Sequence, residues 1–356
     1  MSSTELPLKT EAKLRDLLDK YASRPDTGRI SFALSSPRRA WTWNYESEAT
    51  QQSYFIASIT KLYTTAVLLQ LRDEKRLELE DPIASHLDVA TVEGLNTFGG
   101  VDRSRDITIR DLMAHTSGIA GYFDQKRRDG GTLLNDILRA DRAWTVPEAI
   151  GIAKRDMPSQ FAPGTPGKAF YSDTNFHLLG MIIESLTGSS WEAAVHDRII
   201  LPLQLNETWA FDAQTIGRYA EVAPMLHGQH PVHIPQAMTS VRAHGGLVST
   251  APDGIAFLQA FVGGALFDSR ALRELSGAWR RIFFPLQYGT GLMRYAMPMF
   301  LSPGHGPREY LGHSGSSGTV LFYAPETDLF ISGNVSQIKN RALVYRLMSR
   351  LGSIAR

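Results

Sequence analysis

Strand-like runs lie at both ends of this chain, and a long stretch with few convincing strands separates them. These runs fall at residues 29–34, 40–45, 288–294, 308–311, 319–324 and 328–335. Strands at the two ends with helices between them favour one antiparallel sheet assembled from both ends. We therefore predict an α+β fold, in which an antiparallel sheet flanked by helices is built from both chain ends and carries an inserted helical subdomain.

Helical segments are recognised by apolar residues that recur on one face of a helix. They are predicted at residues 11–21, 59–71, 109–114, 147–155, 174–186, 190–200 and 336–351. The 356 residues suffice for one large domain or two. We expect residues 1–84 and 206–356 to form the sheet domain and residues 85–205 to form the helical subdomain.

The predicted helix at residues 59–71 is apolar on most of its surface and is preceded by Ser58. Lys61 follows three residues later, so both side chains lie on one face. A serine hydroxyl is a weak nucleophile until a base takes its proton, and a lysine in apolar surroundings can be that base. Backbone N–H groups at the helix start are free to bind an oxyanion. The pattern is typical of an acyl-transfer site. In the alternative interpretation, Ser58 only caps the helix and Lys61 is a solvated surface side chain.

Two more segments carry candidate partners. Tyr171-Ser172-Asp173 stands directly before the predicted helix at residues 174–186. Ser172 or Asp173 is a suitable N-cap for that helix. Tyr171 has two interpretations: an ordinary packing residue, or a second general base whose phenolate is favoured by a nearby lysine cation. His313 lies in a Gly/Ser-rich segment between two strand-like runs, where glycines let the backbone approach a ligand. The alternative there is an incidental histidine.

Composition excludes several classes of function. The 37 basic and 36 acidic residues give a net charge of +1, so no basic excess points to nucleic acid or an anionic membrane. The absence of cysteine excludes disulfides, thiolate metal sites and a cysteine nucleophile. No apolar run approaches the roughly 20 residues that span a bilayer. Residues 1–7 lack a secretory signal, so we expect a cytoplasmic protein with no membrane partner.

The remaining histidines and glycines do not indicate a metal or cofactor. His227, His230 and His233 are spaced three apart, but nearby prolines break any helix that would align them. We expect loop histidines and no metal site. No phosphate loop or dinucleotide fingerprint is present, so no cofactor is expected. His115 follows a predicted helix, where we expect it to shape a turn.

Three ordered motifs resemble those of the penicillin-recognising serine hydrolases. That family includes class C β-lactamases, D-Ala-D-Ala carboxypeptidases, D-aminopeptidases, amidases and family VIII carboxylesterases. The motifs are Ser58-Ile59-Thr60-Lys61, Tyr171-Ser172-Asp173 and His313-Ser314-Gly315. Connecting segments also resemble the family, at residues 79–82, 107–118, 161–164 and 245–250. The resemblance spans about residues 31 to 335 and implies a β-lactamase/transpeptidase-like fold.

The resemblance implies a role for each motif. Ser58 would be the nucleophile, and Lys61 and Tyr171 would share the general base and acid work. The backbone N–H groups of Ser58 and Ser316 would form the oxyanion hole. His313 would flank the site on a strand edge, stabilising charge or binding a substrate carboxylate or carbonyl.

The resemblance also implies that Asp173, Ser314 and Gly315 contact the substrate.

Two motif positions depart from the pattern of the β-lactamases. His313 stands where many β-lactamases have lysine, and Asp173 stands where they usually have asparagine. An amide can donate to a substrate carbonyl, whereas an ionised carboxylate only accepts. Asp173 could instead pair with Lys61, which would favour the charged lysine and shift base duty to the tyrosine of the second motif.

These features predict a serine hydrolase that works through an acyl-enzyme, with a small-molecule ester as the preferred substrate. The alternative is an amide hydrolase, such as a D-amino-acid amidase, a D-aminopeptidase or a D-Ala-D-Ala carboxypeptidase-type enzyme, with weak β-lactamase activity possible. An acyltransferase and a non-catalytic binding protein are further alternatives. We expect the active site between the two domains, with walls from residues 115–135, 225–245 and 284–308. The oligomeric state is not specified by the sequence.

Overall fold

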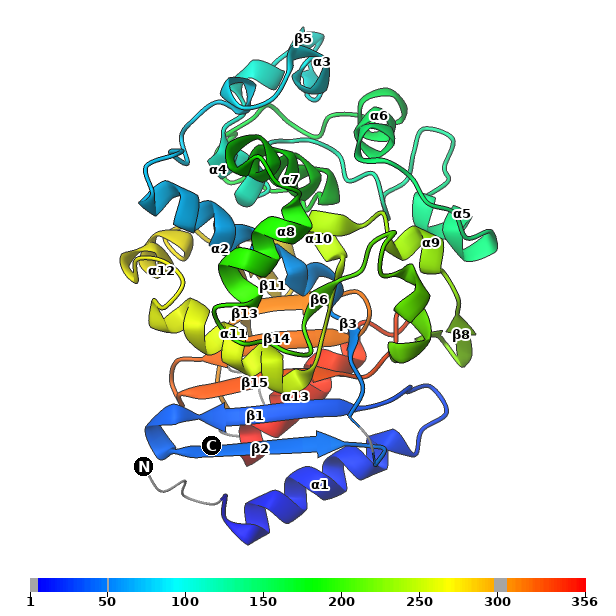
Figure 1. The fold of residues 1–356 in the computed structure, drawn as a ribbon, viewed down its shortest axis with the longest axis vertical. Coiled ribbons are helices and arrows are strands. Elements are labelled where there is room, and N and C mark those ends of the chain that lie inside the picture. Colours follow the sequence, from blue (N-terminus) through cyan, green and yellow to red (C-terminus); the bar gives the residue numbers. More distant parts are fainter. Residues whose placement is uncertain (1–5, 50, 298–305) are drawn as a thin grey trace.

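An eight-stranded antiparallel sheet dominates the computed structural model, which describes residues 6–49, 51–297 and 306–356 (Figure 1). Its strand order is β10-β11-β12-β13-β14-β15-β1-β2. The strands are β1 (Ser31–Ser36), β2 (Trp41–Glu46), β10 (Arg280–Phe283), β11 (Leu286–Tyr288), β12 (Met293–Ala296), β13 (Glu309–Gly315), β14 (Thr319–Ala324) and β15 (Leu329–Asn334). Because β1 pairs with β15, the two ends of the chain lie side by side. The predicted α+β fold is confirmed.

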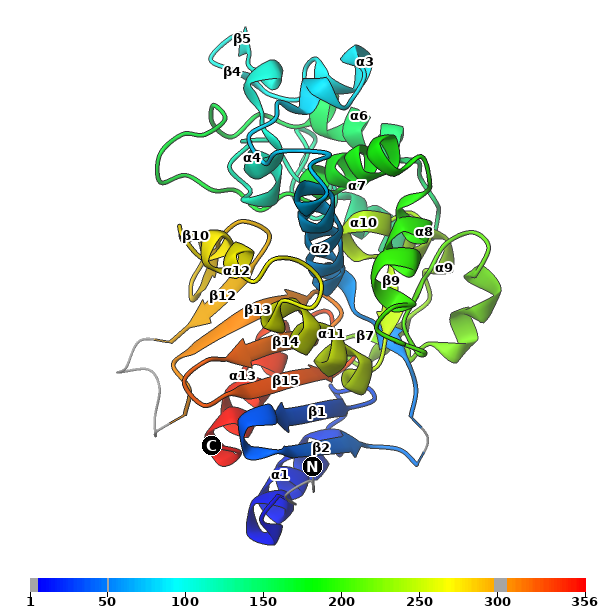
Figure 2. The ribbon, with the colours of Figure 1, turned by 60° about the vertical axis from the view of Figure 1, so that its left-hand side comes forward.

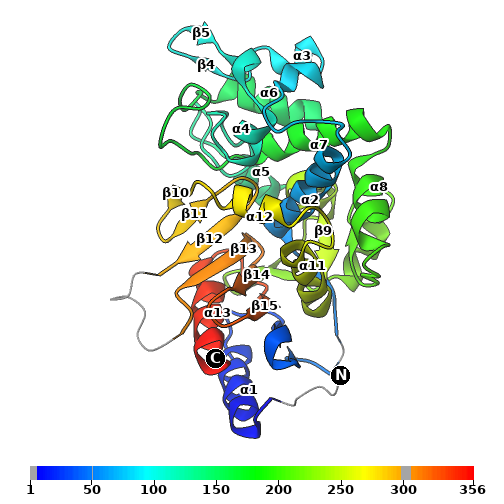
Figure 3. The same cartoon turned by 90° about the vertical axis from the view of Figure 1, so that its left-hand side faces the viewer.

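Helices cover both faces of this sheet (Figure 3). Helices α1 (Leu8–Ala22) and α13 (Ala342–Ile354) pack on one face, where Leu14 and Leu347 meet Phe322 of β14 in one apolar cluster. Helix α11 (Ala251–Gly263) contacts β1, β14 and β15 from the other face. Helix α2 (Thr60–Asp73) runs from the sheet into the helical region (Figure 2).

The helical region consists mainly of short elements. Within residues 85–205 the α-helices are α3 (Val89–Val92), α4 (Ile109–Met113), α5 (Leu133–Arg139), α6 (Val146–Asp156), α7 (Asp173–Thr187) and α8 (Trp191–Val195). Three further short helices follow in the sequence: α9 (Pro235–Met238), α10 (Arg242–Gly245) and α12 (Arg270–Leu275). The small sheets contain β3 (Tyr54–Phe55), β4 (Thr97–Phe98), β5 (Val101–Asp102), β6 (Trp209–Ala210), β7 (Met225–His227), β8 (His230–Val232) and β9 (Leu247–Ser249). The division into two domains remains a prediction.

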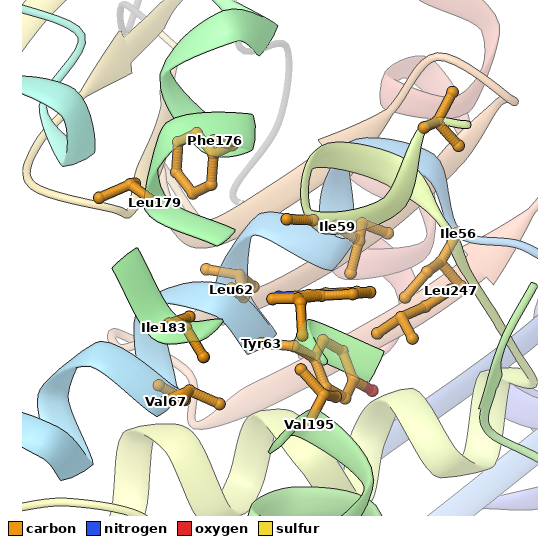
Figure 4. Packing of buried hydrophobic residues seen from close by; sticks show 14 of the residues in the cluster. Ile56, Ile59, Leu62, Tyr63, Val67, Phe176, Leu179, Ile183, Val195 and Leu247 are labelled. Carbon is orange, nitrogen blue, oxygen red and sulfur yellow. The ribbon is translucent and has the colours of Figure 1, made fainter. Parts of the chain in front are cut away.

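Helix α2 is held on all sides, as its apolar sequence predicts. Leu62, Tyr63 and Val67 are fully buried. They share a packed cluster with Phe176 and Ile183 of α7 (Figure 4). Burying a side chain of this size stabilises the fold by about 1.5–3 kcal/mol relative to exposure. The helix therefore gives the residues at its first turn a rigid base.

Several predicted boundaries were wrong. The strand expected at residues 288–294 is two strands, β11 and β12, joined by a turn in which Gly289 N–H donates to Leu292 O at 2.8 Å. The helix expected from residue 336 begins at Ala342 as α13. The strand expected at residues 308–311 is longer: β13 runs through Gly315 and includes His313, which the resemblance placed on a strand edge. Strand β10 and helix α11 were not predicted. Of the predicted pocket wall at residues 284–308, residues 298–305 lie outside the described residues.

Of the three clustered histidines, His233 lies in a loop as predicted, whereas His227 and His230 belong to short strands. His227 and His230 pair across the strands β7 and β8, while the His233 ring packs edge-on against Tyr219, with centroids 5.0 Å apart.

Throughout the described ranges, no helix is both long and apolar enough to cross a membrane.

Candidate active site

Ser58 lies in a 3₁₀ turn, Ala57–Ile59, that leads directly into α2. The preceding residue, Ala57, has φ of 46°, a left-handed conformation that is unfavourable for a residue with a Cβ atom. Such strain persists only where neighbouring structure holds it. Ile56 N–H supplies one such restraint by donating to Leu247 O at 3.0 Å. Ser58 as a residue is partly exposed to solvent.

Lys61 is fully buried and points its ammonium group at three acceptors. Its Nζ atom lies 3.1 Å from Ser58 Oγ, 2.7 Å from Asp173 Oδ1 and 2.8 Å from the His244 carbonyl oxygen. Burial lowers the pKa of Lys61, and the Asp173 charge opposes this effect without reversing it. The predicted meeting of Ser58 and Lys61 on one helix face is therefore present in the structure.

Asp173 forms the predicted pair with Lys61, at 2.7 Å. Its second partner is His244, whose Nδ1 lies 3.4 Å from the same carboxylate oxygen. Burial disfavours the charged carboxylate, but Lys61 and His244 outweigh burial and hold the pKa of Asp173 well below its ordinary value. Both of these contacts are made by Oδ1, and Asp173 as a residue is 8% exposed. The substrate contact predicted for Asp173 stays a prediction.

Tyr171 brings its ring over the lysine, with Lys61 Nζ 5.0 Å from the ring centroid. The expectation of a favoured phenolate is not met, because burial and the Asp173 charge raise the pKa of Tyr171 well above 10, and the nearby Ser58 hydroxyl only partly opposes them. The phenol is therefore neutral in the free protein. In this form it is a proton donor.

His115 fixes the segment that carries Tyr171. Its carbonyl oxygen accepts from Phe170 N–H at 2.8 Å, and its Nδ1 accepts from Ser172 N–H at 3.1 Å. The imidazole packs on the Tyr171 ring with centroids 4.4 Å apart. Ser172 occupies the predicted cap position of α7, but its hydroxyl donates to Ala120 O at 3.1 Å instead of to the helix. His115 thus shapes a turn, as predicted, and also orients the tyrosine.

The end of β13 is fastened to the turn that carries Ser58. The hydroxyl of Ser317 donates to Phe55 O at 2.7 Å, and that of Thr319 donates to Ile56 O at 3.1 Å. A Cβ atom on Gly315 would lie 2.4 Å from Ile56 O, so only glycine fits this close approach. The glycine lets two protein backbones meet, and the substrate contact predicted for Gly315 stays a prediction.

His313 does not have the environment of a charge-stabilising group. It is fully buried, its Nδ1 donates to Ser314 O at 2.7 Å, and its Nε2 accepts from Tyr288 Oη at 3.0 Å. Burial lowers the pKa of His313 to about 3, so the ring is neutral near pH 7. Ser314 was predicted to contact substrate, yet its hydroxyl is hydrogen-bonded to Tyr345 of α13. His313 and Ser314 thus have internal hydrogen-bond partners, and the substrate-side roles predicted for them stay predictions.

Two backbone N–H groups beside this strand are free. Within the described residues, no acceptor is found for the N–H of Ser58 or of Ser316, which is the first residue of the turn after β13. Because β13 is fastened to the Ser58 turn, the two groups belong to one rigid unit. The oxyanion hole predicted for them stays a prediction.

One residue of the site was missed by the sequence analysis. His244 contacts Lys61 through its carbonyl oxygen and Asp173 through its ring. It stands directly before the segment at residues 245–250 that resembles the penicillin-recognising hydrolases. Its position beside that segment could have marked it as a candidate. Its place in the site, however, depends on the packing of α10 against α2 and α7, which the sequence does not reveal.

Comparison with known proteins identifies the family. A family model described as Beta-lactamase matches residues 32–342. The chain belongs to the Beta-lactamase family. It is therefore a serine hydrolase of the β-lactamase and penicillin-binding protein type with a β-lactamase/transpeptidase-like fold. Both the predicted resemblance and the predicted fold are confirmed.

Individual relatives of this Beta-lactamase family chain are distant. Penicillin-binding protein 4 of Amycolatopsis lactamdurans is 27% identical over 287 residues, which cover 77% of this chain and 68% of that protein. A D-stereospecific amidohydrolase from Streptomyces is 26% identical, with a TM-score of 0.73 and coverage of 92% of this chain and 94% of that chain. EstCE1, described as a hydrolase with promiscuous acyltransferase activity, has a TM-score of 0.77 at 15% identity, with 98% of both chains covered. The likeness to EstCE1 concerns the fold alone.

Proposed function

We propose that this chain hydrolyses small carboxylic esters through an acyl-enzyme formed on Ser58. The observation that carries the proposal is the 3.1 Å contact between Lys61 Nζ and Ser58 Oγ. Burial lowers the pKa of the lysine, which makes its neutral amine accessible as a base. A serine whose proton has an acceptor at this distance is an activated nucleophile.

The acylation step uses Ser58 and Lys61, which are in contact, and Tyr171, whose ring centroid lies 5.0 Å from Lys61 Nζ. Neutral Lys61 takes the proton of Ser58 while Oγ bonds to the substrate carbonyl carbon. The N–H groups of Ser58 and Ser316 receive the developing oxyanion. The neutral phenol of Tyr171 gives its proton to the leaving group, and the Lys61 ammonium reprotonates it. In deacylation a water molecule attacks the ester carbon, its proton passes to Lys61, and Ser58 regains a proton as it leaves.

The Asp173 environment supports the preference for esters. An amide substrate profits from a side-chain donor on its carbonyl, as asparagine provides, whereas the Asp173 carboxylate only accepts and has Lys61 and His244 at its Oδ1 atom. Esters need less help because an alkoxide is a better leaving group than an amide anion. A specific likeness supports a second candidate, amide hydrolysis on D-amino-acid derivatives: the D-stereospecific amidohydrolase of Streptomyces is 26% identical over nearly the whole chain.

A covalent probe and a substrate panel test the proposal. A fluorophosphonate should add one adduct mass to the wild-type chain, and the Ser58→Ala variant should remain unlabelled. The same two proteins are then assayed with p-nitrophenyl butyrate, D-alanine p-nitroanilide and nitrocefin. Ester turnover at least tenfold above anilide turnover, absent in Ser58→Ala, is the expected result. Turnover of the anilide at a comparable or higher rate would reverse the ranking. An unlabelled wild-type chain would favour a non-catalytic binding protein.

A further inference from the structure

A buried chain of hydrogen bonds extends behind Lys61 and away from Ser58. It starts at His244, whose carbonyl oxygen accepts from Lys61 Nζ at 2.8 Å and whose Nδ1 lies 3.4 Å from Asp173 Oδ1. The other ring nitrogen, Nε2, lies 2.8 Å from the hydroxyl of Tyr122. His244 is 4% exposed and Tyr122 is fully buried.

Tyr122 lies at the centre of this buried series of hydrogen bonds. Besides His244, its hydroxyl contacts His177 Nε2 at 2.9 Å and accepts from Trp144 Nε1–H at 3.2 Å. His177 belongs to α7, four residues after Asp173, and is also buried. Among the described residues, His177 Nδ1 has no hydrogen-bond partner. In the part of the chain that the structure describes, this series of hydrogen bonds therefore ends at His177 on one side and reaches the Lys61–Asp173 pair on the other.

One arrangement of protons satisfies these contacts. Tyr122 has one proton, so it donates to one histidine and accepts from the other. If it donates to His244 Nε2, then His244 carries its proton on Nδ1, which faces the Asp173 carboxylate. His177 then donates through Nε2, and its unpartnered Nδ1 is only an unused acceptor. The reverse direction would turn a neutral His244 lone pair toward the Asp173 charge and leave a buried His177 N–H without an acceptor.

We propose, on the basis of the function proposed above, that His244 is a positioning residue for the catalytic lysine. Its Nδ1–H binds the Asp173 carboxylate and takes up part of its charge, while Tyr122 and His177 fix the proton on Nδ1. The carboxylate then stabilises the Lys61 ammonium less strongly, and the lysine loses its proton more readily.

The surroundings agree with a neutral His244. Burial lowers the pKa of His244 and holds that of His177 well below its ordinary value, so both rings are neutral near pH 7. The other titratable or charged groups that act on this cluster come from α2, α4 and its following loop, α7, α10 and β13. They are Lys61, His115, Asp124, Tyr171, Asp173, Arg242 and His313. Arg242 is itself neutralised by Glu184 and Glu192.

The test is the pH dependence of Ser58 acylation in His244→Leu, His244→Asn and Tyr122→Phe. The rate of fluorophosphonate labelling and kcat/KM for p-nitrophenyl butyrate are followed from pH 5 to 9. Losing a hydrogen bond to a charged group is worth about 1.5 kcal/mol, or roughly one pH unit. His244→Leu should thus move the acid limb of both profiles up by about one unit. His244→Asn retains an N–H donor near the Nδ1 position and should stay within a few tenths of the wild type.

Tyr122→Phe keeps the ring and the histidine but removes the hydroxyl that fixes the tautomer, so a smaller upward shift is expected. It also decides the matter if His244→Leu does not fold. Coincident profiles in wild type and Tyr122→Phe, or equal shifts in His244→Leu and His244→Asn, would overturn the inference. A wild-type chain that the probe does not label would instead refute the proposed function.

Discussion

The Nζ atom of Lys61 lies 2.7 Å from Oδ1 of Asp173, and the lysine side chain of this ion pair is fully closed to solvent. Two charges this close attract strongly, but both have given up much of their hydration. Removing either partner therefore leaves the other without a counter-charge beside Ser58. Two of the following predictions use this asymmetry.

Asp173→Asn should move the acid limb of the kcat/KM profile to lower pH. Burial lowers the pKa of Lys61, and Asp173 is the strongest opposing influence. Without the carboxylate, the lysine loses its proton at a lower pH. Ester hydrolysis measured from pH 5 to 9 checks the direction. Asp124→Asn is the matched control, because Asp124 acts on Lys61 in the same sense but more weakly. An acid limb that does not move in Asp173→Asn would contradict the coupling.

Lys61→Met should destabilise the fold by about 3–5 kcal/mol, because it leaves a buried carboxylate unpaired. The double variant Lys61→Met/Asp173→Asn should recover a large part of that loss, since the remaining amide is neutral. Urea unfolding at pH 7 of the wild type, both single variants and the double variant gives the coupling energy. Strictly additive effects would mean that the ion pair has no net interaction in the folded state.

Acid should destabilise the fold partly through His313. Burial lowers the pKa of this ring to about 3 in the folded state, whereas an unfolded histidine titrates near 6.5. The unfolded chain therefore binds the proton first, and stability is lost as the pH falls from about 6.5 toward 3. The full effect of one such histidine is roughly 5 kcal/mol. Unfolding free energies of wild type and His313→Gln between pH 7 and 4 check this, and the variant should show the shallower decline. Parallel curves would mean that His313 titrates normally.

Gly315→Ala should reduce both stability and activity. The added Cβ would lie 2.4 Å from Ile56 O and 2.3 Å from Thr319 Oγ1, which forces β13 away from the turn that carries Ser58. Overpacking of this kind typically destabilises by about 1–3 kcal/mol. Thermal unfolding and ester turnover measure the two effects. Gly217→Ala is the control, because a Cβ there meets nothing within 4 Å. Equal behaviour of the two variants would show that the close approach is unimportant.

The features that depend on local sequence were predictable. The spacing of apolar residues defined α2 to within two residues at either end, and the three-residue interval of Ser58 and Lys61 brought their side chains together. The pairing of Asp173 with Lys61 followed from the chemistry of a carboxylate in an asparagine position. Each of these features could be inferred from one short segment or from a motif of a known family.

The features that depend on tertiary contacts were not predictable. His313 has a motif position typical of a site residue, but its partner Tyr288 comes from β11, two strands away in the sheet. His244 acquires its role only because α10 packs against both α2 and α7. The turn between β11 and β12 contains Gly289, Thr290 and Gly291, and the apolar residues on either side of it belong to two paired strands.

The pairing of β1 between β15 and β2 also constrains how the protein is made. During synthesis, residues 31–46 leave the ribosome before the helical region, and their hydrogen-bonding partner at residues 329–334 leaves after it. Contacts of such long sequence separation form slowly. The hairpin of β1 and β2 therefore keeps the β15-facing edge of β1 unpaired until the whole helical region has been made.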